Sequence, residues 1–212
     1  MFVYGSTLSP FVRKVMAYGA EKGIALELKG VNPGSPDPEF RECSPFGKIP
    51  GFRDGDFAIS DSSAIIAYLE AKHPEPALIP TEPKARARTV WYDEFGDTIL
   101  VAAAGKMFFN RIVAPRFMGL PGDMEAADKA EREELPPILD YVEKIAPASG
   151  FLVEDRLTLA DLAVASPFVN LGQAGYKLDA DVYPKTAAYV GAILARPSFA
   201  PMIAAEKTML GG

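Results

Sequence analysis

The sequence contains one cysteine, Cys43, and one histidine, His73, among its 212 residues. One cysteine cannot form a disulfide within the chain, which favours a reducing, cytoplasmic setting. A zinc site built from several cysteine and histidine ligands cannot form in one such chain. A serine–histidine–aspartate arrangement would need His73 as its base. We therefore expect no metal site, and we predict that neither Cys43 nor His73 has a functional role.

Long hydrophobic runs and an excess of positive charge are also missing. No stretch of about 18 apolar residues occurs, so no membrane-spanning helix is expected. The N-terminus shows no basic region leading into an apolar stretch, so no signal peptide is expected. The formal net charge is −6, which repels phosphate backbones and argues against a nucleic-acid partner. Hydrophobic residues make up 49% of the chain, enough for a globular core.

Strand and helix signals alternate over residues 1–73, which predicts an α/β domain. Ser9 followed by Pro10 is a strong helix start, because serine caps the helix and proline fits its first position. Three prolines within residues 32–38 block both regular elements there. In order, the patterns predict a strand at 2–4, a helix from Ser9-Pro10 to about Gly23, a strand at 26–28, a loop at 32–38, a hairpin at 51–59 and a helix at 60–72.

Four prolines occur within residues 74–83, which we interpret as a linker. The strand signals then vanish, so residues 84–212 are predicted to form an all-helical domain. Thr158 and Asp161 resemble a capping box in which aspartate replaces the usual glutamate or glutamine. Helical patterns cover 84–111, with a bend near Pro115, then 124–146 and 158–171, and two shorter helices follow Pro184 and Pro197. The predicted fold class is α/β plus all-α.

Ser9 has two interpretations. As a plain N-cap, its oxygen accepts a backbone N–H and stabilises the helix by about 1 kcal/mol. As a functional residue, Ser9 would instead donate a hydrogen bond from its hydroxyl to an anion, such as the thiolate of a bound ligand. The helix end favours such an anion, because it offers unpaired N–H groups and a partial positive charge. Lowering the pKa of a thiol by about 2 units, from about 8.5, requires about 2.7 kcal/mol. A charge-assisted hydrogen bond and the helix end together supply energy of this order.

Two further segments, Ile49-Pro50 and Asp61-Ser62, are equally open to two interpretations. Ile49-Pro50 is either an ordinary trans turn or a cis bond that leaves the Ile49 backbone free to pair with an extended peptide. Asp61 and Ser62 are either plain capping residues or a carboxylate site at a helix start, with Asp61 facing an ammonium group. The γ-glutamyl end of glutathione carries both of these charges.

Taken together, these segments resemble the glutathione transferase superfamily, and its cytosolic, serine-type members related to the bacterial, theta, tau or omega classes. The resemblance extends over nearly the whole chain. Its motifs are Ser9-Pro10-Phe11-Val12-Arg13-Lys14, Ser44-Pro45-Phe46-Gly47-Lys48-Ile49-Pro50, Asp61-Ser62-Ser63-Ala64-Ile65, Phe151-Leu152-Val153 with Leu157-Thr158-Leu159-Ala160-Asp161, and Arg196-Pro197-Ser198-Phe199.

The resemblance implies a thioredoxin-like N-terminal domain with cis Pro50 and with glutathione as co-substrate. It implies that Ser9 stabilises the thiolate, with Ser6, Thr7 and, more weakly, Tyr4 as rivals for that role. Many relatives hold the glycyl carboxylate with a residue that is replaced here by Pro36-Asp37-Pro38, and Arg41 is a substitute candidate. The expected glutathione-binding residues are Phe11, Lys48, Ile49, Pro50, Asp61 and Ser62.

In relatives, the end of the first long helix lines the second-substrate site, although aromatic and methionine clusters also form cores. Arg111 and Arg116 hint at an acidic group on the substrate. Trp91 and Tyr92 are expected in the core or at a dimer contact. The candidates for the second-substrate pocket are Phe108, Arg111, Ile112 and Phe117.

These residues and the resemblance predict a glutathione transferase that adds the thiolate of glutathione to a small apolar electrophile. The resemblance also implies a homodimer, because relatives are usually dimers. One alternative is a non-catalytic module that binds glutathione, another ligand or a protein partner. A second is a glutathione-dependent reductase, isomerase or ether-cleaving enzyme. Serine at position 9 cannot form a mixed disulfide, which disfavours thiol exchange.

Overall fold

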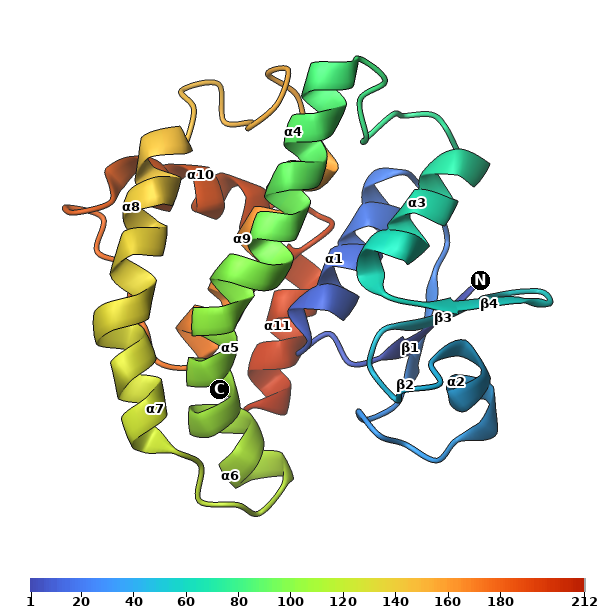
Figure 1. Cartoon of the computed structure of the whole chain (residues 1–212), viewed down its shortest axis with the longest axis horizontal. Helices are drawn as coiled ribbons and strands as arrows, with labels where there is room; N and C mark the ends of the chain where they lie inside the picture. The colour runs from blue at the N-terminus through green and yellow to red at the C-terminus, as the bar shows by residue number, and fades with distance from the viewer. Residues whose placement is uncertain (212) are drawn as a thin grey trace. The chain divides into compact units, whose positions relative to one another are not determined.

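The computed structural model describes residues 1–211, which form two compact units (Figure 1). The first unit contains the chain from Met1 to Ile79 together with the C-terminal segment that begins at Pro197. The second unit runs from Pro80 to Arg196. None of the helices in the described part of the chain has the length and apolar character needed to cross a bilayer.

The first unit is an α/β fold built on a four-stranded sheet in the order β2-β1-β3-β4. Strand β1 pairs with β2 in parallel and with β3 in antiparallel fashion, and β3 and β4 form a hairpin. Its elements are β1 (Phe2–Gly5), α1 (Pro10–Glu21), β2 (Glu27–Gly30), α2 (Pro38–Cys43), β3 (Gly51–Asp54), β4 (Phe57–Ser60), α3 (Ser62–Lys72) and α11 (Ala200–Met209).

Helices cover both faces of this sheet, with α1 and α3 on one side and α2 on the other (Figure 1). Successive residues of a strand point to opposite faces, and both Val3 and Tyr4 of β1 are buried. Tyr4 packs with Phe40 and Cys43 of α2. The central strand β1 is therefore covered on both sides, and its C-terminal end leads directly into the loop before α1.

Helix α2 is an element that the sequence patterns did not predict. Asp37 caps it by accepting a hydrogen bond from the Phe40 N–H at 2.8 Å. Pro38 occupies its first turn, where the missing N–H costs nothing. The third proline of the predicted loop therefore begins a helix instead of extending the loop.

The C-terminal segment from Pro197 belongs to the first compact unit, although it follows the helices of the second unit in sequence. Within this unit, Arg13 of α1 and Glu206 of α11 form a buried ion pair. Ser198 also donates a hydrogen bond to Glu21 at the end of α1, at 2.5 Å. These two contacts join residues that are 193 and 177 positions apart in sequence, so no local sequence pattern predicts them.

The regular structure of the second unit is helical, apart from an isolated bridge between Val153 and Arg156. The first two continuous helical stretches of this unit both contain π-helical segments, which are labelled η. Its elements are α4 (Pro83–Glu94), η1 (Phe95–Leu100), α5 (Val101–Phe108), η2 (Phe109–Val113), α6 (Ala114–Phe117), α7 (Met124–Lys129), η3 (Ala130–Glu134), α8 (Leu135–Ile145), α9 (Leu159–Gln173) and α10 (Pro184–Leu194).

Helix α9 forms the core of the second unit, because every residue from Leu159 to Leu171 is buried. Gly96 of η1 permits close packing against it. A Cβ atom at Gly96 would lie 2.6 Å from the Ala163 carbonyl oxygen, so only glycine fits there without a shift. The predicted capping box is present, with Thr158 and Asp161 exchanging hydrogen bonds at the start of α9.

Candidate functional site

Ser9 lies at the N-terminus of α1 and caps it. Its Oγ accepts a hydrogen bond from the Val12 N–H at 3.5 Å, which is at the outer limit for such a bond. Its backbone is extended, and Pro10 follows in the first turn. The side chain is half-buried. Ser9 therefore caps α1, as the first interpretation predicts. Because this hydrogen bond is weak, the hydroxyl can also donate a hydrogen bond to a bound ligand.

The neighbouring hydroxyls differ from Ser9 in their surroundings. Ser6 Oγ accepts from the Leu8 N–H at 3.3 Å, and Thr7 is buried. The Tyr4 hydroxyl donates to Glu39 Oε2 at 3.0 Å. Burial, reinforced by the hydrogen bond to Glu39, raises the pKa of Tyr4. The Tyr4 hydroxyl is thus neutral and already donates its hydrogen bond to Glu39 of α2. Tyr4 is therefore a poor candidate for stabilising a thiolate.

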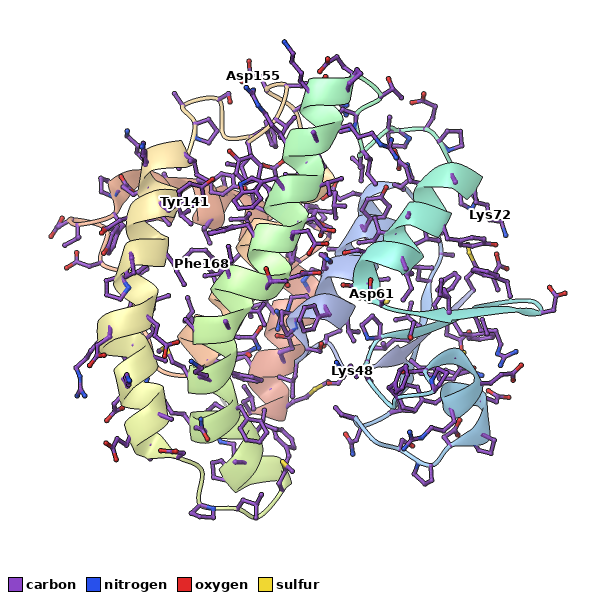
Figure 2. The ribbon with its side chains drawn as sticks, in the orientation of Figure 1. Lys48, Asp61, Lys72, Tyr141, Asp155 and Phe168 are labelled. Atoms are coloured by element: carbon purple, nitrogen blue, oxygen red, sulfur yellow. The ribbon has the colours of Figure 1, made fainter. Side chains whose placement is uncertain are left out.

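The Ile49–Pro50 peptide bond is cis, in agreement with what the resemblance implies. Pro50 is buried and Ile49 is half-buried. Strand β3 begins at Gly51, which pairs with Tyr4, so Ile49 precedes the ladder. Ser44 Oγ donates to the Lys48 carbonyl at 2.7 Å and steadies the loop. Lys48 itself is exposed, in the segment that leads into β3 (Figure 2).

Gly5, at the end of β1, brings the Ser9 region and the Ile49 region together. A Cβ atom at Gly5 would lie 2.6 Å from Val12 Cγ2 and 3.2 Å from Ile49 Cβ. Its φ of +154° is also one that other residues rarely adopt. The first turn of α1 and the cis-proline segment therefore meet at this glycine. Sequence reasoning missed Gly5, although a glycine directly after a buried strand is a signal for close approach.

Asp61 and Ser62 lie at the N-terminus of α3, as the sequence predicted. Asp61 Oδ1 accepts from the N–H groups of Ser63 and Ala64, each at 3.0 Å. Its φ of +81° is unusual for a residue with a side chain, and backbone strain of this kind is enriched at binding sites. Asp61 is exposed, at the start of α3 (Figure 2), whereas Ser62 is buried.

Lys14 connects the starts of the two helices. Its side chain lies on α1 with no exposed surface, and its Nζ donates to Ser63 Oγ of α3 at 3.4 Å. A buried ammonium beside a helix N-terminus adds positive potential where a carboxylate would bind. Sequence reasoning did not assign a role to Lys14; the available signal was a charged residue next to the apolar positions of α1. Phe11, half-buried, occupies the first turn of the same helix.

Arg41 forms hydrogen bonds with the loops on both sides of α2. Its Nε and Nη2 donate to the carbonyl oxygens of Ser35 and Gly34, each at 2.7 Å. Its Nη1 donates to the Pro45 carbonyl at 3.4 Å. All three nitrogens therefore bind backbone carbonyls. This arrangement gives Arg41 a structural role and weakens its candidacy as the group that holds a ligand carboxylate.

The pocket candidates of the helical unit fall into three environments. Phe108 and Ile112 are buried, whereas Phe117 is 55% exposed. Arg111 forms ion pairs with Asp128 at 2.7 Å and with Glu131 at 2.6 Å. Its charge is thus balanced within the unit, which weakens the hint of an acidic substrate. The exposed large apolar residues in the same stretch of chain are Phe109, Phe117, Met118, Leu120 and Met124.

Cys43 is buried against Tyr4 and Phe40, and this burial raises the pKa of its thiol. The thiol is therefore protonated and inert at neutral pH. Within residues 1–211, no group of three or more histidine, cysteine or acidic side chains is arranged to hold a metal ion.

Comparison with known proteins agrees with this architecture. The family model described as "Glutathione S-transferase, N-terminal domain" matches residues 3–77, and that of the C-terminal domain matches residues 114–205. A glutathione S-transferase of Hyoscyamus muticus is 32% identical, over 96% of this chain and 97% of its own.

Solved glutathione S-transferase structures match nearly the whole chain. Glutathione S-transferase-I bound with lactoylglutathione gives a TM-score of 0.83 at 26% identity, covering 96% of this chain and 98% of its own. A glutathione S-transferase of Methylobacterium radiotolerans, in complex with glutathione sulfonate, gives 0.78 at 27% identity, covering 95% and 93%. The predicted fold class is thereby confirmed, and the chain belongs to the glutathione S-transferase superfamily.

Proposed function

We propose that this protein binds glutathione, stabilises its thiolate with Ser9 and adds it to an apolar electrophile. The observation that carries this proposal is the position of Ser9. It stands at the N-terminus of α1, and Gly5 packs against both the first turn of that helix and Ile49. A thiolate there would receive a hydrogen bond from the Ser9 hydroxyl and would lie at the positive end of the helix dipole. The single, buried cysteine suits a cytoplasmic location for this chemistry.

The remaining parts of glutathione have matching surroundings in the first unit. The backbone of Ile49, outside the β ladder, would pair with the cysteinyl part of the peptide. The N-terminus of α3, with Ser62 and the nearby Lys14, would bind the γ-glutamyl carboxylate. Asp61 would bind the γ-glutamyl ammonium, and Lys48 would add a donor close by.

We propose an electrophile that is apolar and needs no carboxylate. Arg111 already pairs with two acidic residues, so it is not available to bind a substrate anion. Phe117 and the exposed apolar residues near it offer hydrophobic surface, and methionines adapt to ligands of different shape. Chemistry at a positioned thiolate needs no covalent intermediate with the protein, so alignment and removal of water would provide much of the rate.

Replacing Ser9 with alanine should raise the pKa of bound glutathione by about 1–2 units, because a hydrogen bond to a charged group contributes about 1.5–3 kcal/mol. Conjugation at a pH below that pKa should slow by about 10- to 100-fold. An ultraviolet difference titration with glutathione, from about pH 5 to pH 9, measures the thiolate directly.

Two variants control this experiment. Ser9→Thr keeps both the hydroxyl and the cap and should retain the thiolate band, whereas Ser6→Ala tests the neighbouring rival. A thiolate band that survives in Ser9→Ala would transfer the role to Ser6 or Thr7. Glutathione binding with no thiolate in the unmodified protein would instead favour the non-catalytic module.

We also propose that the protein is a homodimer that associates through α4 and η1. Val90 and Trp91 are each 49% exposed and Ile99 is 41% exposed, so this helical stretch presents large apolar side chains to solvent. Sedimentation equilibrium should give twice the 22.8 kDa chain mass. Trp91→Glu should shift the equilibrium toward the monomer, because it would place a charge in an apolar interface. A monomer in the unmodified protein would contradict the proposal.

A further inference from the structure

The ion pair between Arg13 and Glu206 is a completely buried charged contact in the first unit. Arg13 Nε donates to Glu206 Oε1 at 2.9 Å, and Nη2 donates to Oε2 at 2.8 Å. Neither side chain has exposed surface. Two parallel hydrogen bonds between a planar guanidinium and a carboxylate fix direction as well as distance. The pair therefore holds one point of α1 in a defined orientation against α11.

That point lies in the first turn of α1. The Arg13 N–H donates to the Ser9 carbonyl at 3.0 Å, which closes the first turn directly onto the capping residue. The side-chain cap from Ser9 to Val12 is weak at 3.5 Å. Local contacts hold the backbone of Ser9, whose N–H donates to the Ser6 carbonyl at 2.9 Å, but the weak cap leaves its hydroxyl loosely oriented. Tertiary contacts to this turn therefore add to the positioning of that hydroxyl.

The C-terminal segment also contacts the opposite end of α1. Ser198 donates to Glu21, the last residue of the helix. The two contacts differ in their distance from Ser9, since one lies in the first turn and the other about three turns away. They can therefore be removed separately, and only one of them is placed to affect the Ser9 end of the helix.

We propose that Glu206 is a positioning residue for thiol activation, acting through Arg13 to hold the first turn of α1 and the Ser9 hydroxyl toward the sulfur of glutathione. The inference rests on the function proposed above. The potential at a helix end acts only near the first turn, and a functional group must be held within about 0.5 Å to be effective. A residue near the end of the chain thus sets the geometry of a site built from its beginning.

The decisive variant is the double substitution Arg13→Met/Glu206→Met. The pair is neutral overall both before and after this change, so an altered thiol pKa reports geometry and not a new charge. The variant removes both charges of the pair together, which destabilises a buried site less than removing one of them. We expect the pKa of bound glutathione to rise by about 0.5–1 unit, which is a roughly 3- to 10-fold smaller thiolate fraction at a pH well below it.

Two single variants complete the experiment. Ser198→Ala removes the contact at the far end of α1 and should leave the thiol pKa unchanged. Glu206→Asp keeps the charge but shortens the side chain by one methylene, so it should raise the thiol pKa by a smaller amount than the double variant. This second variant also decides the question if the double variant does not fold.

The outcomes separate the inference from the proposed function. A thiolate band in the unmodified protein, with the same pKa in both Glu206 variants, would overturn the positioning role and leave the function standing. An equal shift in Ser198→Ala would also overturn it, because a general loosening of the C-terminal segment would then explain the effect. Absence of the thiolate in the unmodified protein would reject the proposed function itself.

Discussion

Replacing Glu206 with glutamine is expected to lower the free energy of unfolding by about 3–5 kcal/mol. The substitution changes little volume but removes the carboxylate that balances the guanidinium of Arg13 in a fully buried site. The buried guanidinium then loses the carboxylate that pairs with it in two hydrogen bonds, and less of its desolvation is offset. Urea denaturation measures this decrease in the free energy of unfolding. Circular dichroism follows the transition, because the strands and helices of the first unit contribute to the signal.

The double variant Arg13→Met/Glu206→Met is the matched control for this measurement. It removes both charges and keeps apolar bulk at both positions, so its stability should lie within about 1–2 kcal/mol of the unmodified protein and could exceed it. A loss below about 1 kcal/mol for Glu206→Gln would place the pair in the class of weak surface bridges. That result would contradict the buried environment described for α1 and α11.

Replacing Asp161 with alanine is expected to destabilise the helical unit by a similar amount, about 3–5 kcal/mol. Asp161 has no exposed surface. It accepts from the Leu152 N–H at 2.8 Å, from the Thr158 N–H at 2.9 Å and hydroxyl at 3.2 Å, and from the Tyr189 hydroxyl at 3.1 Å. Alanine would leave these buried and part-buried donors without their acceptor. Each such loss costs about 1–3 kcal/mol, and the losses are not fully additive.

Asp123 provides a matched control because it is also a capping aspartate, at the exposed start of α7. Its Oδ1 accepts one hydrogen bond, from the Ala126 N–H at 2.9 Å. Asp123→Ala should therefore cost only about 1 kcal/mol, the usual effect of losing an exposed cap. Equal losses for the two variants, measured by the same urea denaturation, would show that Asp161 acts as a simple cap and not as the centre of a buried network.

Local patterns in the sequence predicted much of the candidate site. Ser9-Pro10 marked the start of α1, Asp61 marked the start of α3, and Thr158 with Asp161 marked the start of α9; all three helices begin there. Helix starts are predictable because their signals lie within three or four residues of one another. The role of Ser9 stays a prediction, since the same position serves both a cap and an anion site.

Tertiary structure decided the features that depend on residues distant in sequence. The sequence suggested that Arg111 contacts the substrate, but in the structure it forms ion pairs with Asp128 and Glu131. Arg41 looked available for a ligand, but three loop carbonyls surround it. The charges of these side chains are visible in the sequence, whereas the partners that neutralise or occupy them are not.

The sequence by itself determined the two kinds of fold, the family motifs and the helix starts, because each depends on composition or on short spacings. Only the tertiary structure decided that α11 joins the first unit, that Gly5 packs against both Val12 and Ile49, and that Arg13 is paired with Glu206. The physical reason is the range of the interactions. Caps and periodicity act within a few residues, while a buried ion pair and a close packing contact exist only once the chain has brought distant segments together.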